Sequence, residues 1–292
     1  MRFFLHNLKK NPLSILGITL VLGFLVIAIF APLIAPTPAG QYDPYMIPRA
    51  GFSPTPRPPT AEHIFGTTQG QYDIFYGVIW GTRTAFQIGL VVIGATLLIG
   101  ILLGSVAGYF GGVIDEVIMR VTDIFLAFPA LILAMAITIA LGPSLTTIML
   151  ALIIVSWPSY ARLVRGDILT TREEDYVQAA KGVGASNFRI ILRHVLPNSI
   201  YPVLVVASLD IGAVVLSAAA LSFLGLGVPE GYADWGQMIS FSRNWIVGTA
   251  TNSFAYWYTV FIPGLFIFLF VLGWNLLGDA FRDILDPRLS RR

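Results

Sequence analysis

The chain has 292 residues, of which 56% are hydrophobic and only 12% are charged, and its mean hydropathy is +0.77. A soluble domain usually carries about 25% charged residues. The composition therefore predicts an integral membrane protein and excludes soluble enzymes, disulfide scaffolds and nucleic-acid-binding modules. The net charge of +2 is too small to indicate a polyanionic partner, and the lack of cysteine excludes thiolate metal sites.

The first predicted membrane helix covers residues 13–34, directly after Lys9 and Lys10. Its 22 residues can cross a hydrocarbon layer of about 30 Å, whereas the apolar part of a secretory signal has about 7 to 15 residues. The second helix is predicted at about 85–109. The uncharged stretch 124–161 is too long for one helix, and Gly142-Pro143 divides it into a third and a fourth, joined as a tight hairpin.

The last two predicted spans are residues 199–226, which include Asp210, and residues 256–277, which begin with three aromatic residues typical of a membrane boundary. The expected fold is thus an all-α membrane protein with six transmembrane helices. The expected parts are an N-terminal segment 1–12, the first helix 13–34, an external loop 35–84, a core 85–278 and a tail 279–292. Within the core lie a cytoplasmic loop 166–197 and an external loop 228–255.

The distribution of basic residues predicts the orientation. Fourteen of the 18 Lys and Arg residues lie in the termini and in the loops 110–123 and 162–197, and the other four are Arg49, Arg57, Arg83 and Arg243. Positively charged residues are retained on the cytoplasmic side. Both termini are therefore expected in the cytoplasm.

Two loops differ in character. Loop 36–84 is rich in proline, which favours stiff, extended backbone, and it is either an ordered external cap or a linker. Segment 172–197 has helical composition, with acidic residues first and basic residues later, as suits a helix dipole. Gly182 and Gly184 divide it into two short helices. The small apolar surface of Val177, Ala179 and Ala180 either packs on the chain's own spans or receives another protein.

The sequence contains no GxxxxGK[ST], HExxH or GxSxG motif, and its three histidines lie at unrelated positions outside the spans. An enzyme is therefore disfavoured. An ion-coupled secondary transporter is also disfavoured, because the six spans hold a single ionisable residue, Asp210. A pore subunit driven by a separate motor accounts for several spans, scarce internal charge and a helical cytoplasmic loop.

One cytoplasmic motif carries a family resemblance. Gln178, Ala179 and Ala180 occupy the positions of an EAA motif, followed by Gly184 and by Leu196-Pro197. Together with AFP at 127–129, LSFLGLG at 221–227 and NLLGDAFRDILDPRL at 275–289, this pattern resembles the permease subunits of binding-protein-dependent ABC importers, in the oligopeptide, dipeptide and nickel branch. The sequence departs from the family pattern at Gln178, where Glu is usual, at His194, where Ile is usual, and at Ala218, where Glu is common.

The resemblance implies a type I ABC importer permease that forms half of a translocation pore in the inner membrane of a prokaryote. The implied partners are a second homologous permease, two cytosolic ATPase subunits that hold ATP and Mg, an extracytoplasmic solute-binding protein and membrane lipid. It implies no cofactor on this chain and no nucleic-acid partner. The residues of the EAA-like motif would couple the pore to the ATPases. Peptides are the implied substrate, and oligosaccharides and nickel remain alternatives.

Asp210 lies about 13 residues after Pro197, which places it roughly 20 Å along a helix and near the middle of the bilayer. A carboxylate that faces lipid there costs at least about 2.5 kcal/mol. Asp210 and Ser217 are therefore candidate pore-lining residues. Asp210 either contacts a cationic group of the solute, pairs with the second permease, or serves as a hydrogen-bonded structural acid.

Overall fold

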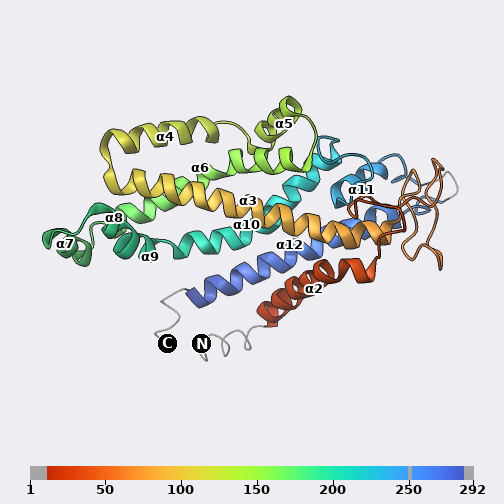
Figure 1. Ribbon diagram of the computed structural model, residues 1–292, viewed down its shortest axis with the longest axis horizontal. Coiled ribbons are helices and arrows are strands. Elements are labelled where there is room, and N and C mark those ends of the chain that lie inside the picture. The colour runs from red at the N-terminus through yellow and green to blue at the C-terminus, as the bar shows by residue number, and fades with distance from the viewer. Residues whose placement is uncertain (1–11, 249–251, 286–292) are drawn as a thin grey trace.

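The computed structural model describes residues 12–248 and 252–285, and the elements within these ranges are helical (Figure 1). Residues 1–11 of the predicted N-terminal segment and residues 286–292 of the predicted tail lie outside the described residues, whereas residues 279–285 belong to α12. The helices are α2 (Pro12–Ile34), α3 (Ile74–Phe110), α4 (Gly112–Leu126), α5 (Ala130–Leu141), α6 (Leu145–Thr171), α7 (Asp175–Gly182), α8 (Asn187–Ile190), the π-helical turn η1 (Ile191–Val195), α9 (Leu196–Ser199), α10 (Tyr201–Phe223), α11 (Trp235–Phe241) and α12 (Tyr258–Leu285).

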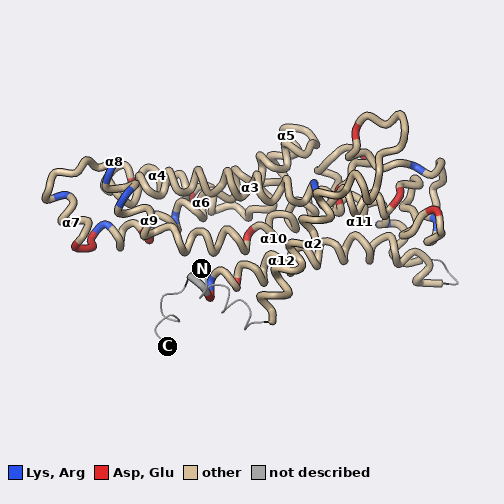
Figure 2. The backbone as a smooth tube through the Cα atoms, turned by 60° about the horizontal axis from the view of Figure 1, so that its bottom comes forward, with Lys and Arg blue, Asp and Glu red and all other residues tan. Residues whose placement is uncertain are grey.

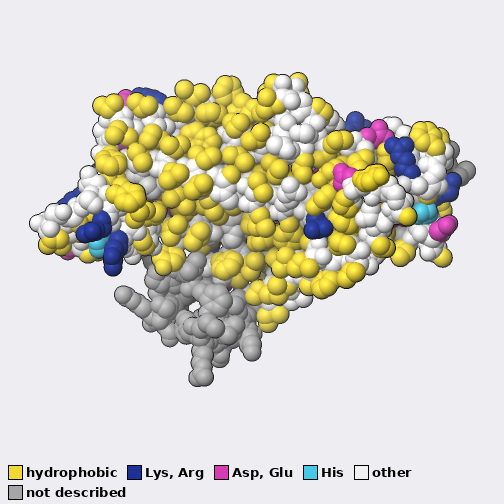
Figure 3. All heavy atoms as spheres, viewed as in Figure 1, with side chains coloured by type: hydrophobic (Ala, Val, Ile, Leu, Met, Phe, Trp, Pro, Cys, Tyr) yellow, Lys and Arg dark blue, Asp and Glu magenta, His cyan; other side chains and the backbone are white. Residues whose placement is uncertain are grey.

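Five helices within the described ranges, α2, α3, α6, α10 and α12, are long and apolar enough to cross a membrane, and α4 with α5 makes a sixth if that bent pair is one span. Charged residues gather toward the two ends of the long axis, and the middle is nearly free of them (Figure 2). Hydrophobic side chains cover the corresponding band of the surface (Figure 3). This distribution is that of a multi-pass membrane protein.

The third span differs from the predicted one. The segment predicted as loop 110–123 is helix α4, and α4 meets α5 at an angle of 85°. The charged residues of this segment suggest a loop, but Asp115 has a partner within the helical bundle. Arg165 of α6 donates two hydrogen bonds to its carboxylate, at 3.0 and 2.6 Å. The bend falls at residues 127–129, where Pro129 removes a backbone donor.

The turn between α5 and α6 lies where the sequence indicates it. Gly142 ends α5 with a φ of 87°, and the Oγ atom of Ser144 accepts a hydrogen bond from the backbone N–H of Thr147 at 3.0 Å, which caps α6. The second span is longer than predicted, because α3 already begins at Ile74 and extends through the proposed loop residues 74–84.

Helices α3 and α6 pack closely along three glycines of α3. A β-carbon at Gly100, Gly104 or Gly108 would lie 2.4 to 3.0 Å from atoms of α6. Small residues at four-residue spacing let helix backbones approach in this way inside membranes. The two helices therefore form a tight pair that runs side by side toward α7 and α8 (Figure 1).

The proline-rich segment 36–73 is folded against the end of the molecule at which α2 ends and α3 begins (Figure 1). Its backbone pairs with the loop before α11, since the Ile47 N–H donates to the Gly231 carbonyl and the Ala233 N–H donates to the Tyr45 carbonyl, both at 2.7 Å. These bonds satisfy backbone groups that a free linker would leave to water. The segment is therefore an ordered cap and not a linker.

Candidate functional site

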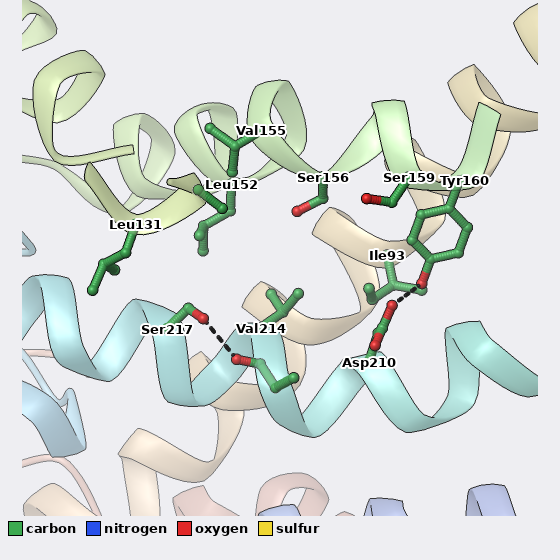
Figure 4. Close-up of a pocket in the computed structure, with 12 residues that line it drawn as sticks. Ile93, Leu131, Leu152, Val155, Ser156, Ser159, Tyr160, Asp210, Val214 and Ser217 are labelled. Carbon is green, nitrogen blue, oxygen red and sulfur yellow. Dashed lines mark hydrogen bonds between the residues drawn. The ribbon is translucent and has the colours of Figure 1, made fainter. Parts of the chain in front are cut away.

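A cavity of about 220 Å³ lies between α6 and α10, with the beginning of α5 and Ile93 of α3 completing its wall (Figure 4). Most of its lining is apolar. The polar lining residues are Ser156, Ser159 and Tyr160 from α6 and Asp210 and Ser217 from α10. They are placed by the helical period, because 156, 159 and 160 share one face of α6 and 210 and 217 share one face of α10.

Asp210 is held by one hydrogen bond across the cavity. The Tyr160 hydroxyl donates to its Oδ2 atom at 2.7 Å. Tyr160 is only 2% exposed, while Asp210 is half-buried. The other carboxylate oxygen, Oδ1, has no hydrogen-bond partner among the described residues. The carboxylate therefore keeps acceptor capacity toward the cavity.

The cavity holds one acidic side chain and no basic one: none of its lining residues, all within the described part of the chain, is Lys, Arg or His. Ser217 uses its hydroxyl hydrogen on the Ala213 carbonyl of its own helix at 2.9 Å, so only its oxygen lone pairs are available. The rim is open, because Ser159, Ala213 and Leu131 are exposed. An isolated carboxylate in a largely apolar, open-sided cavity attracts a cationic or hydrogen-bond-donating group.

The structure brings the two sequence-predicted residues, Asp210 and Ser217, onto the same cavity wall. Sequence reasoning missed Tyr160, Ser156 and Ser159. Their polar character at spacings of three and four residues within an uncharged span was a signal that could have found them. Ala218, where the resembled family often has Glu, is buried and does not line the cavity, so Asp210 does not occupy the place of that acid.

The loop 172–197, which is predicted to lie in the cytoplasm, is the second candidate site. Helix α7 ends at Gly182, and Gly184 follows with a φ of 78°. The Ala185 N–H donates to the Ala180 carbonyl at 3.1 Å and the Gly184 N–H to the Lys181 carbonyl at 3.0 Å, which closes the turn. Only a residue that tolerates the left-handed region fits at Gly184 without strain.

The small-residue surface of this loop is divided between two faces. Val177 is fully buried and Ala180 is 9% exposed, so these two residues pack within the chain, as the first of the two alternatives has it. Gln178 and Ala179 are exposed. The division follows from the helical period, because 177 and 180 are three positions apart and face the chain's own helices.

The loop is anchored to the C-terminal end of α3. An Nη atom of Arg172 donates to the Gly108 carbonyl at 2.8 Å, and the Tyr109 hydroxyl donates to Asn187 Oδ1 at 3.0 Å. Leu196 and Pro197 form the start of α9, about two turns after the exposed Phe188. The loop is thus a folded unit joined to α3, with an exposed outer face.

Comparison with known families matches residues 100–291 to the binding-protein-dependent transport system inner membrane component. The chain belongs to this family. Residues 1–54 match the N-terminal transmembrane domain of oligopeptide transport permease C. Family members are transport components, and the matched region contains the EAA-like loop and all of the cavity lining except Ile93.

This permease is similar over nearly its whole length to curated relatives. It is 44% identical to the dipeptide transport system permease protein DppC of Alkalihalophilus pseudofirmus, over 97% of this chain and 88% of the relative. It is 42% identical to the probable D,D-dipeptide transport system permease protein DdpC of Escherichia coli, over 96% and 89%.

Among solved structures, the methionine ABC transporter MetNI, in inward-facing conformations, matches 73% of this permease and 98% of its own chain, with a TM-score of 0.56 and 17% sequence identity. At this identity the likeness concerns the fold alone. The fold is that of a type I ABC importer permease. The described residues contain no group of three His, Cys, Asp or Glu placed to hold a metal ion.

Proposed function

We propose that this permease forms one half of a peptide translocation pathway, completed by a second homologous permease and driven by two ATPase subunits in the cytoplasm. The proposal rests mainly on one observation: the cavity and the loop 172–197 are built on the same two helices, α6 and α10. Helix α6 lines the open-sided cavity with Ser156 and Tyr160 and leads directly into the exposed cytoplasmic loop.

Transmission from the motor to the cavity follows from this arrangement. The outer face of α7, with Gln178 and Ala179, would receive the ATPase subunits, and Gly184 shapes the turn that presents this face. Leu196 and Pro197 then lead the chain into α10, which carries Asp210 and Ser217. A rigid-body shift of the loop would therefore move both walls of the cavity, as alternating access requires. ATP and Mg would be bound by the partner subunits.

The proposed orientation places the loop and both termini in the cytoplasm and the folded cap 36–73 outside, in a bacterial inner membrane. The cap then provides a surface for an extracytoplasmic solute-binding protein. Peptides are the proposed cargo, because the two relatives above are named for dipeptide and D,D-dipeptide transport. Oligosaccharides and nickel are the alternatives to test against.

The test is transport by the complete complex. This permease, its second permease and both ATPase subunits are reconstituted into liposomes with the binding protein in excess, and uptake of labelled dialanine, an oligosaccharide and Ni²⁺ is measured with and without Mg-ATP. ATP-dependent uptake of dialanine alone supports the proposal. Uptake of another solute in place of dialanine would replace the substrate class, and uptake driven by an ion gradient without ATP would overturn the mechanism.

A further inference from the structure

The cavity between α6 and α10 contains one carboxylate, that of Asp210, and no positively charged side chain among its described lining residues. Asp210 is the tenth residue of the 23-residue helix α10, so it lies far from either helix end. A carboxylate accepts up to about four hydrogen bonds, and the Tyr160 hydroxyl supplies one of them. The described chain places no basic side chain against this cavity. The described residues therefore leave Asp210 free to accept a cationic partner from a solute.

The size of the cavity limits what this partner can be. Sites that enclose a whole small-molecule ligand have volumes of about 300 to 1,000 Å³. The volume here, about 220 Å³, is smaller, and one side of the cavity is open at Ser159 and Ala213. Such a space fits one end of an elongated solute while the remainder extends through the open side.

The ligand atoms favour an organic ammonium over a metal ion. Mg²⁺ and Ca²⁺ require about six to eight oxygen ligands, most often with more than one carboxylate. The cavity provides a single carboxylate together with the hydroxyls of Ser156, Ser159 and Ser217. An ammonium group has three donors and needs three acceptors, which a carboxylate oxygen and neighbouring hydroxyls can supply.

We propose that this cavity binds the terminal ammonium group of a peptide in transit, with Asp210 as its charged acceptor and with Ser156 and Ser159 as neutral acceptors beside it. Figure 4 shows both serines projecting from α6 toward the helix that carries Asp210. The apolar side chains of Ile93, Leu152 and Val214 border this group and lower the local dielectric constant, which strengthens a charge-assisted hydrogen bond. This inference rests on the proposed function, because it names the part of the peptide that the pathway recognises.

Tyr160 limits the strength of this contact. Its hydroxyl already donates a hydrogen bond to the Oδ2 atom of Asp210, so one acceptor position of the carboxylate is occupied before a solute arrives. A site that conducts a solute must bind it weakly enough to release it. Tyr160 is therefore a positioning residue, which holds the carboxylate toward the cavity and moderates its affinity for a cation.

The test compares dialanine with N-acetyl-dialanine, which has the same backbone but no ammonium group. Both are supplied at saturating binding protein in the reconstituted complex, and the ratio of their maximal uptake rates is measured for wild type, Asp210→Asn and Tyr160→Phe. Because all complexes receive the same loaded binding protein, its own selectivity cancels between variants. Ser208→Ala is the matched control, since Ser208 lies on α10, bonds to the Val205 carbonyl of its own helix and does not line the cavity.

We expect Asp210→Asn to lower the dialanine to N-acetyl-dialanine ratio by about tenfold, the loss expected for one charge-assisted hydrogen bond. Tyr160→Phe retains the carboxylate and should keep the preference for the free amine, and Ser208→Ala should leave the ratio as in wild type. If Asp210 only accepts the Tyr160 hydrogen bond, Asp210→Asn and Tyr160→Phe will lower both rates alike and the inference is wrong.

Two further outcomes are distinguishable. A wild-type complex that fails to carry either peptide contradicts the proposed function itself. A wild-type complex that carries dialanine, together with an unchanged ratio in Asp210→Asn, contradicts only the ammonium site. Thermal unfolding of each purified complex identifies variants that lose transport through misfolding, and a variant that unfolds early is replaced by Asp210→Ser, for which the same tenfold fall in the ratio is expected.

Discussion

Gly104 of α3 and Ala161 of α6 lie so close that a β-carbon at Gly104 would be 2.5 Å from the Ala161 carbonyl oxygen. Backbone atoms cannot yield as a flexible side chain does. Gly104→Ala should therefore force α3 and α6 apart and destabilise the permease by about 1 to 3 kcal/mol. Gly94→Ala is the control on the same helix, because a β-carbon there has nothing within 4 Å. Equal thermal unfolding midpoints for the two variants would contradict this packing.

Asp234 caps α11 by accepting a hydrogen bond from the Gln237 N–H at 2.8 Å, and burial raises its pKa to about 6, from an ordinary value of 3.8. The folded state thus favours the protonated acid. Its contribution to stability is complete below about pH 4 and is lost as the pH rises through about 6. Asp234→Asn retains the capping oxygen without the titration, so its stability relative to wild type should rise by up to roughly 3 kcal/mol between pH 4 and pH 8.

Unfolding midpoints of the two proteins across this pH range measure the effect of Asp234. Glu62→Gln, at an exposed position of the folded segment 36–73, is the control and should give a curve parallel to that of wild type. A constant difference between Asp234→Asn and wild type would show that the ionisation of Asp234 is not linked to folding.

Gly184 requires its positive φ of 78°, whereas nothing lies within 4 Å of a β-carbon built there. Gly184→Ala should therefore cost about 1 kcal/mol through the backbone alone and loosen the turn after α7. Gly182→Ala, at an equally open position within α7, should be neutral or stabilising. Hydrogen exchange of the α7 amides compares the two variants, and equal protection would refute a strained turn.

Substitutions at Ala179 and Ala180 can distinguish a loss of ATPase docking from a loss of folding. The side chain of Ala179 is exposed, whereas that of Ala180 is buried. Ala179→Asp should leave the permease folded and reduce transport and solute-stimulated ATP hydrolysis, since a charge enters the proposed ATPase contact. Ala180→Asp should instead destabilise the loop by burying an unpaired charge. Normal coupling in a folded Ala179→Asp complex would remove α7 from the ATPase interface.

The orientation can be tested with single cysteines, because the chain has none of its own. Positions 57 and 181 are both exposed, and the segment 36–73 and helix α7 that carry them lie at opposite ends of the molecule (Figure 1). Arg57→Cys should react with an impermeant maleimide in intact cells, and Lys181→Cys should react only after the membrane is opened. The reverse pattern would invert the proposed topology.

The apolar spans could be predicted from the sequence, because the thickness of the bilayer sets the length of each spanning helix. The turn at Gly142 was also predictable, since glycine and proline act locally. Helix α4 was not, because its acids suggest a loop until Arg165, 50 residues away, is placed against Asp115. The division of Val177 and Ala179 between buried and exposed faces likewise depends on packing partners that are distant in the chain.

At the candidate site, Asp210 was conspicuous as the one ionisable residue of its span. Tyr160 was not, because a tyrosine in an apolar helix has many roles, and only the tertiary structure shows that its hydroxyl reaches this carboxylate. Residue type therefore indicated Asp210 as the candidate functional residue. Its hydrogen-bond partner Tyr160 could not be predicted, because the contact depends on how α6 and α10 pack against each other.

The open side of the cavity, at Ser159 and Ala213, has a consequence for how substrate range changes during evolution. Under the proposed function, this permease contributes only part of the surface that a passing solute meets, and the second permease supplies the rest. Selectivity is then a property of the pair. Exchange of one subunit for a homologue would alter the set of accepted solutes without any substitution in the other, so two gene lineages can generate more specificities together than either could alone.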